Sequence, residues 1–451
     1  MASANSGWGV RGRVRTGLAT AGAAALCTAV AVGAVGALPG AAYAAGPGGE
    51  SAYRTGPDSR RIEGGANQAV GPTLELGRFY EDRLAPAQER FYQVVLDDRS
   101  SVYIAAVARP GPQSKVAYGD GIEAVLLDTK GNSCSAPDGV SFGSEQARPL
   151  ADVAVRRLEE DGKCQQAGPY YVKLTRTSAK DSDQAPWPVE LHMMREPKLS
   201  GSNAPQTAPS AWPSAPVTQP SDQRVVRSGG TGFNDARALD AGVWGDTVQP
   251  GQTRFYRVPV DWGQQLSIGT ELTGGKLTQT SGYAGNGLVA EVFSPARLPV
   301  ASEDESYDGK QAQVALGPLA PVAYENRYAD ARAMRPVRTA GWYYLAVTVD
   351  KKVGEFTAED VPLQLTLRVK LTGTAGPGPA YAESLSAAGF GVGEDDRAAA
   401  RDGLTAPEAA DAADTRSAMT VVAATGFGTG TLLLLVLAGW ILLGRRSATS
   451  G

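Results

Sequence analysis

An internal repeat dominates this sequence of 451 residues. The stretch that begins at Asp82 matches the stretch that begins at Asp246, with a constant offset of 164 residues and identical Asp, Pro, Gln, Arg, Phe, Tyr and Val positions. Three more blocks recur in the same order, namely Tyr118–Ala124 with Tyr283–Ala290, Ala167–Val172 with Ala340–Leu345, and Pro188–Met193 with Pro362–Leu367. Four blocks in one order indicate two copies of a single structural unit.

Each repeated block has the pattern of a β-strand. Pro188–Met193 and Pro362–Leu367 alternate apolar with polar residues, a period that buries one face of a strand and exposes the other. On this pattern His192 is expected on the solvent face. Neither copy shows a sustained apolar period of 3.6 residues. The sequence therefore predicts an all-β ectodomain with two tandem antiparallel β-sandwiches, at 70–195 and 233–372.

The order of these motifs resembles the bacterial pre-peptidase C-terminal domain. A turn with Pro and Gln, a Phe-Tyr-x-Val strand, a Gly-x-Gly turn and an Ala-Gly-x-Tyr-Tyr strand follow one another in both copies. The likeness covers about 70–195 and 235–372. Members of this family are jelly-roll-like β-sandwiches that are usually appended to secreted proteases and collagenases. The resemblance implies a jelly-roll-like fold and a non-catalytic accessory module, and it names no substrate.

The N-terminal end has the composition of a secretory signal peptide over 1–44. Three arginines precede an apolar run from Gly17 to Leu38, and small residues close the segment at Ala42-Tyr43-Ala44. Cleavage is expected after Ala44. The apolar run is longer than usual, so an uncleaved anchor is the alternative.

The C-terminal end carries an uncharged stretch of 26 residues at 418–443, followed by Arg445 and Arg446. As a helix it would be about 39 Å long, enough to cross a hydrocarbon core. The basic tail at 444–451 is expected in the cytoplasm and the ectodomain outside, which predicts a single-pass type I protein of the plasma membrane. A G-x-x-x-G motif at Gly426 and Gly430 permits pairing of two such helices, and the oligomeric state stays open.

Composition predicts three connecting segments. Residues 45–69 are expected to be a flexible N-terminal segment, and 196–232 a semi-extended linker rich in Pro and Ser. Residues 373–417 are rich in Ala, Gly and acids, with few large apolar side chains. They are expected to form a stalk that holds the sandwiches away from the membrane.

The three cysteines predict one disulfide. Cys27 lies in the predicted signal peptide, which leaves Cys134 and Cys164, both in the first repeat. Outside the cytoplasm such a pair is expected to be oxidised. Closing a loop of about 30 residues contributes roughly 3.5 kcal/mol on the chain-entropy model. A reactive or metal-binding pair is the weaker alternative.

Charge and histidine content exclude several function classes. Without both ends, 47 acids and 38 bases leave a net charge of −9, the wrong sign for a nucleic-acid partner. One histidine and three cysteines exclude a histidine-rich metal site and a zinc ribbon. No cofactor is expected. Arg outnumbers Lys by 32 to 11, a bias associated with GC-rich actinobacterial genomes.

Two candidate chemical motifs were weighed. Gly139–Gly143 matches the G-x-S-x-G pattern around Ser141, with His192 farther along, but the hydrolase elbow needs a strand–turn–helix context that this region lacks. No catalytic residue is therefore expected. The acids Glu303, Asp304, Glu305 and Asp308 form the one possible weak calcium cluster; a solvated hairpin tip is the alternative.

Seven aromatic residues are expected to fill the sandwich cores or to form cross-strand pairs, with a surface that stacks on sugars or peptides as the weaker alternative: Tyr80, Tyr92, Trp187, Trp244, Tyr256, Trp262 and Trp342. The sequence favours a non-enzymatic binding or adhesion protein of the cell surface. Its partner would be a protein or a polymer of the cell envelope. The alternative is a scaffold or accessory subunit of an envelope or secretion complex in the membrane.

Overall fold

The structure is a computed structural model that describes residues 53–136, 138–159, 162–201 and 207–447, except for the side chains of 417–418, 420–430 and 442–447. The chain divides into two compact units, Met1–Gly49 and Glu50–Gly451, and all described residues belong to the second. The predicted signal peptide 1–44 lies outside the described residues.

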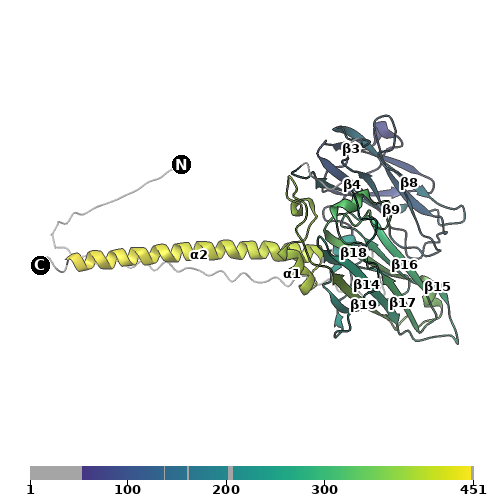
Figure 1. Ribbon diagram of the computed structural model, residues 1–451. Helices are drawn as coiled ribbons and strands as arrows, with labels where there is room; N and C mark the ends of the chain where they lie inside the picture. The colour runs from purple at the N-terminus through teal and green to yellow at the C-terminus, as the bar shows by residue number, and fades with distance from the viewer. Residues whose placement is uncertain (1–52, 137, 160–161, 202–206, 448–451) are drawn as a thin grey trace, which may run out of the picture. The chain divides into compact units, whose positions relative to one another are not determined.

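The first repeat folds into two sheets of mostly antiparallel strands (Figure 1). One sheet has the order β1 (Arg60–Arg61), β2 (Phe79–Leu84), β9 (Trp187–Pro197), β4 (Ser100–Ala108) and β7 (Leu150–Arg156). The other has the order β3 (Glu89–Leu96), β8 (Gly168–Thr177), β5 (Gly121–Leu127) and β6 (Val140–Ser141).

The second repeat has the same arrangement with one additional short strand, β11. One sheet has the order β10 (Val225–Val226), β12 (Gly242–Val248), β19 (Leu363–Thr372), β14 (Gln265–Thr273) and β17 (Gln311–Leu316). The other has the order β11 (Arg237–Ala238), β13 (Thr253–Val260), β18 (Gly341–Val349), β15 (Ala284–Phe293) and β16 (Pro299–Tyr307). The predicted mostly-β architecture of tandem antiparallel sandwiches is confirmed, because equivalent strands occupy equivalent places in both copies.

Each sandwich has its own apolar core, built by the alternation that the sequence shows. Val189, Leu191 and Met193 of β9 point into the first core, and Leu363, Leu365 and Leu367 of β19 point into the second. Short 3-10 helices lie at Gln68–Val70 (η1), Phe233–Asp235 (η2), Tyr324–Tyr328 (η3), Lys351–Glu355 (η4) and Ser386–Ala388 (η5).

Strand β4 is buried on both faces, because the two sandwiches pack against each other. Its residues Ile104 and Ala106 face the first core, whereas Val107 belongs to a separate apolar cluster with Phe255 and Phe293 of the second sandwich. β4 reads Ser-Ser-Val-Tyr-Ile-Ala-Ala-Val-Ala, and such a nearly continuous apolar run is typical of a strand covered on both sides.

Ion pairs complete the interface between the sandwiches. Glu190 on β9 pairs with Arg297 at 2.6 Å, and Glu196 on the same strand pairs with Arg327 at 2.6 Å. All four side chains are almost fully buried. A buried charge without its partner is strongly destabilising, so these pairs hold the two sandwiches in one orientation.

The described part of the predicted flexible segment 45–69, residues 53–69, packs against both sandwiches. Tyr53 packs edge-on against Phe255, and the Gly56 amide donates to the Glu190 carboxylate at 2.7 Å. β1 then adds to the edge of the first sheet beside β2. This short segment has no core of its own. It is held in place by the Tyr53 ring and the Gly56 amide, which contact the interface between the two sandwiches.

The Pro/Ser-rich linker 196–232 lies along the second sandwich over its described part. The Trp212 indole donates to the Pro318 carbonyl at 3.1 Å, and Gln265 donates to the Pro213 carbonyl at 2.9 Å. β10 at its end pairs with β12. Proline has no backbone N–H and cannot take full part in a strand ladder. In this linker a side chain of the sandwich, Gln265, donates to the proline carbonyl.

The predicted stalk 373–417 is also different, because residues 373–403, here called the strap, pack on both sandwiches. Phe390 is 2% exposed and lies in an apolar cluster with Tyr103 of the first sandwich. The strap ends in helix α1 (Glu394–Asp402), where Arg397 pairs with Asp261 of the second sandwich at 2.6 Å. The composition of the strap does not predict this docking, because the strap has few apolar residues. Those few pack against the surface of the two sandwiches.

The final helix, α2 (Ala406–Ser447), is continuous and contains the stretch 418–443 (Figure 1). Within the described residues, no helix combines the length and the apolarity that crossing a membrane requires.

Candidate functional site

The predicted disulfide between Cys134 and Cys164 is present. It joins the loop after β5 to the loop before β8, and both cysteines pack against the first core. The bridge is confined to the first sandwich, whereas the second has no equivalent cysteine. It is a local crosslink rather than a reactive site.

Most of the candidate stacking aromatics are core residues. The favoured place in the sandwich cores is confirmed for the six that are buried, which are Tyr80, Tyr92, Trp187, Trp244, Tyr256 and Trp262. Three arginines lie over the tryptophan rings: Arg176 over Trp187 at 3.6 Å, Arg227 over Trp244 at 3.9 Å and Arg257 over Trp342 at 4.0 Å. These ring faces are therefore not free for a ligand.

The residues identical between the repeats form the same buried polar contact in each copy. Asp82 accepts from the Tyr92 hydroxyl at 2.7 Å, and Asp246 accepts from the Tyr256 hydroxyl at 2.7 Å. Each aspartate also accepts from a glycine amide at 2.8 Å. Burial, and then the nearby carboxylate, raise the pKa of both tyrosines well above the ordinary value. These identities therefore serve the fold.

The acidic cluster lies on and just beyond the edge strand β16. Neighbouring residues of a strand point to opposite faces, so Asp304 is on the other side from Glu303 and Glu305. Asp304 accepts from Asn286 at 2.6 Å, and Asp308 pairs with Lys310 at 3.4 Å. Among the described residues, no group of three or more His, Cys, Asp or Glu side chains could hold a metal ion.

His192 is half-buried rather than on the open solvent face predicted for it, because the second sandwich and the strap pack on that side of β9. Its ring stacks on Phe79 at 4.0 Å, and Nδ1 is buried without a hydrogen-bond partner in the described structure. Burial, followed by the charge of Arg297, lowers its pKa to about 3. Ser141 lies on β6, in the other sheet, so the structure does not bring the two together.

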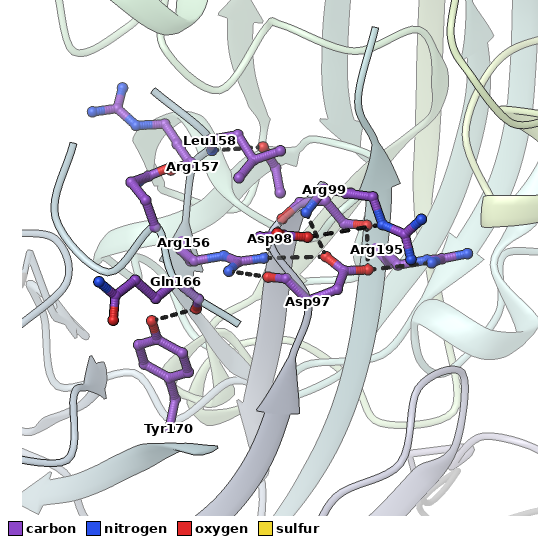
Figure 2. A network of polar contacts seen from close by, with 12 residues as sticks. Asp97, Asp98, Arg99, Arg156, Arg157, Leu158, Gln166, Tyr170 and Arg195 are labelled. Atoms are coloured by element: carbon purple, nitrogen blue, oxygen red, sulfur yellow. Dashed lines mark hydrogen bonds and ion pairs between the residues drawn. The ribbon is translucent and has the colours of Figure 1, made fainter. Parts of the chain in front are cut away.

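Figure 2 shows a polar cluster at the turn between β3 and β4. Asp97 pairs with Arg156 at 3.6 Å and with Arg195 at 3.5 Å, and it accepts from the Ser100 hydroxyl at 2.9 Å. Burial alone would raise the pKa of Asp97, but the Arg99 amide, the Ser100 hydroxyl and Arg156 lower it overall. These contacts tie the turn to Arg156 of β7 and Arg195 of β9.

The strongest candidate for a binding site is a cleft of about 560 Å³ on the second sandwich. Its walls are Trp262 and Gly263, the stretch 322–325, the start of the linker at 199–201, and the strap at 376–380. The cleft exists because the strap pairs with the linker beside it: the Ser200 amide donates to the Ala380 carbonyl at 2.9 Å.

Two aromatic rings line the cleft. Trp262 is 9% exposed, and Gly378 lies so close to its indole that a Cβ there would come within 2.1 Å of Nε1. Tyr324 is half-buried, and the Arg327 guanidinium lies 3.4 Å over its ring. Only the opposite ring face and the edge of Tyr324 can therefore contact a ligand. Burial raises the pKa of Tyr324, so its hydroxyl remains a neutral donor.

The described lining carries one ionisable acid, Glu325, and no Lys or Arg. The Ser200 hydroxyl donates to the Ala380 carbonyl at 3.2 Å, so the remaining polar groups are the Tyr324 hydroxyl and backbone amides and carbonyls. Such a lining suits a neutral ligand with an apolar face and several hydroxyl or amide groups.

Sequence reasoning found only Trp262 among the residues of this cleft. Tyr324 and the strap residues 376–380 were missed, because segments far apart in the sequence meet there. A Gly-Pro-Gly-Pro run at 376–379 is the one local signal, since it indicates an extended segment without regular hydrogen bonding.

No protein-family model matches the chain, and no curated protein matches it. Solved structures with some likeness include the tandem CBM22-1–CBM22-2 domain of Paenibacillus barcinonensis Xyn10C, at 13% identity and a TM-score of 0.18 over 65% of this chain and 86% of that one. The tandem CBM51 modules of Sp3GH98 from Streptococcus pneumoniae SP3-BS71 match at 10% identity and 0.16, over 64% and 82%. The CUB1-EGF-CUB2 domain of human MASP-1/3 matches at 8% and 0.17, over 65% and 99%. Likenesses this weak establish no function for this chain.

Proposed function

We propose that this chain is a non-enzymatic binding protein of the cell surface, which holds a neutral segment of an envelope polysaccharide in the cleft beside Trp262 and Tyr324. The observation that carries the proposal is the cleft itself, with two aromatic rings and hydroxyl and backbone donors. Sugar rings have apolar faces and a hydroxyl rim, and this lining complements both.

The acidic character of the protein supports a neutral ligand over an anionic one. Glu325 is the only charged group of the described lining, and the ectodomain as a whole carries an excess of acids. A polyanion such as a phosphate-rich wall polymer would be repelled.

Export and anchoring are part of the same proposal. The signal-like segment 1–44 and the uncharged stretch 418–443 support export and a single-pass membrane anchor at the plasma membrane. Six consecutive described residues of α2, Leu432–Leu437, expose their apolar side chains, and a bilayer would bury them. Alkaline carbonate extraction should leave the full chain in the membrane pellet, and release of the chain would refute the anchor.

Affinity electrophoresis of the full-length protein in gels that contain neutral envelope polysaccharides tests the binding. Ala380→Trp fills the cleft from the exposed strap, and we expect at least tenfold weaker retardation. Ala382→Trp is the matched control, because Ala382 is exposed on the same strap but outside the cleft. Equal binding by both variants, or none by the unaltered chain, would refute the assignment.

A scaffold in a membrane complex is the second candidate function, and two exposed tyrosines favour it. Tyr118 and Tyr283 occupy equivalent positions in the two repeats, and each is 71% exposed. Large exposed aromatics are enriched where proteins bind one another. A photo-crosslinker at each position should trap the same partner on intact cells if this candidate holds, and no specific partner if it does not.

A further inference from the structure

The linker segment 207–221, here called the hydroxyl segment, carries five exposed hydroxyl residues in an uncharged, proline-rich stretch: Thr207, Ser210, Ser214, Thr218 and Ser221. Four prolines and one tryptophan are spaced among them. We infer that the hydroxyl segment is a site of O-glycosylation, in which sugars are attached to these hydroxyls during or after export.

The hydroxyl segment is held open rather than folded upon itself. Two side chains of the second sandwich donate to its carbonyls, Gln265 to Pro213 at 2.9 Å and Arg368 to Pro220 at 3.1 Å, and the Trp212 indole of the segment donates to the Pro318 carbonyl. No hydrogen bond joins its backbone to other described backbone atoms. A transferase needs an extended acceptor, and this one is presented in that form by the second sandwich.

The five exposed hydroxyls have no hydrogen-bond partner among the described residues, in contrast to some loop hydroxyls of this chain. Ser114 donates to Asp183, and Ser384 is hydrogen-bonded to Ser386. A hydroxyl without an internal bond can be substituted without disturbing the fold. Segments rich in Ser, Thr and Pro cannot build a core of their own, and in exported proteins such segments carry O-linked sugars.

The reaction needs a sugar activated by a phosphate. The hydroxyl oxygen forms a bond to the anomeric carbon, and the bond from that carbon to the phosphate oxygen breaks. The phosphate leaves with the electron pair, and the hydroxyl proton passes to a base of the transferase. No oxidant or reductant takes part.

The test is site-resolved mass spectrometry of the full chain from its native host. Trypsin releases the hydroxyl segment within 199–224 and part of the strap within 371–397, because no Lys or Arg lies inside either peptide. We expect additions in steps of one sugar mass on at least one of the five hydroxyls. Ser384 and Ser386 in the strap peptide are the control sites, because they are exposed but hydrogen-bonded to each other, and both should be unmodified.

A variant with all five residues changed to Ala should lose the additions and unfold at an unchanged temperature. The inference is overturned if the segment is unmodified, or if it carries phosphate in place of sugar. Equal modification of Ser384 and Ser386 in the strap would also overturn it.

The glycosylation inference rests on the proposed export. One further experiment distinguishes a failure of glycosylation from a failure of export. A chain that lacks 1–44 stays in the cytoplasm if the export proposal is right. Modification of the exported chain alone indicates a lipid-linked donor at the membrane, whereas modification of both indicates a nucleotide sugar. Export without modification would refute only the glycosylation.

Discussion

At the scale of single residues, the positions that the two repeats share are explained by buried polar contacts. The hydroxyl of Tyr92 or Tyr256 satisfies the carboxylate of Asp82 or Asp246 inside each sandwich. Gln88 and Gln252 close the intervening turns, each accepting from the backbone amide three residues earlier. A buried polar group without a partner is expensive, so both members of each contact are needed together.

Tyr256→Phe tests this contact. The change removes one donor from the buried Asp246 carboxylate, and we expect a loss of about 1–3 kcal/mol in the free energy of unfolding, measured in urea. Tyr283→Phe, at a highly exposed position, is the control and should change stability by less than about 0.5 kcal/mol. Equal stability of both variants would contradict a structural role for the contact.

The single histidine should make the protein sensitive to mild acid. The pKa of His192 is lowered to about 3 in the folded state, whereas an unfolded histidine titrates near 6.5. The unfolded chain therefore binds one more proton as pH falls below that value, and the folded state loses stability. Between pH 7.5 and 5.5 the loss is about 1.4 kcal/mol from this group.

His192→Gln should abolish that part of the pH dependence, because glutamine does not titrate. Urea denaturation of both proteins at pH 7.5 and 5.5 measures it. If the variant loses as much stability as the unaltered protein over this range, His192 is not the group responsible.

At the scale of elements, the strap is the segment whose structure differs most from what its composition predicts. One phenylalanine, one helix and a few ion pairs dock it across both sandwiches. Docking depends on a surface that already exists, so the strap should detach more easily than any strand.

Phe390→Ala tests how the strap is held. The change leaves a cavity beside Tyr103, and we expect a loss of about 3–5 kcal/mol, expressed as release of the strap rather than unfolding of the sandwiches. Trypsin should then cleave after Arg397 much faster. Ser386→Ala, on the same strap and exposed, should leave the cleavage rate unchanged. If trypsin cleaved the Phe390 variant no faster than the unaltered protein, Phe390 would not be needed to hold the strap on the sandwiches.

At the scale of the whole molecule, the described part of the chain is one body made of two sandwiches. Apolar residues and buried ion pairs join the outer face of the β2-β9-β4-β7 sheet to the second sandwich. The N-terminal segment and the strap reinforce the same interface. The two sandwiches are therefore held in one orientation to each other.

A protease site inserted between Ser214 and Ala215 tests this integration. After cleavage the two pieces should elute together from a sizing column and separate only in denaturant. Arg327→Met leaves Glu196 buried without its partner, at a cost of about 3–5 kcal/mol, and the cleaved variant should come apart. Separation of the cleaved but otherwise unaltered chain would refute a tight interface.

The repeat, the strand alternation and the disulfide followed from the sequence because each depends on local spacing. A period of two in Pro188–Met193 identifies a strand and the side chains that it buries in its own sandwich. Two cysteines left in one repeat specify their own pairing. The strand pattern does not by itself distinguish a ring in a core from a ring on a surface, so only the tertiary structure decided that most of the candidate aromatics are buried.

By itself, the sequence determined that this protein contains two copies of one β-unit, how their strands alternate and which cysteines join. Only the tertiary structure decided that β4 and His192 are covered on their second side, that the supposed stalk is a docked strap, and that Trp262 and Tyr324 share a cleft. The physical reason is that alternation reports whether a residue is apolar, whereas burial of an outer face depends on which distant surface packs against it.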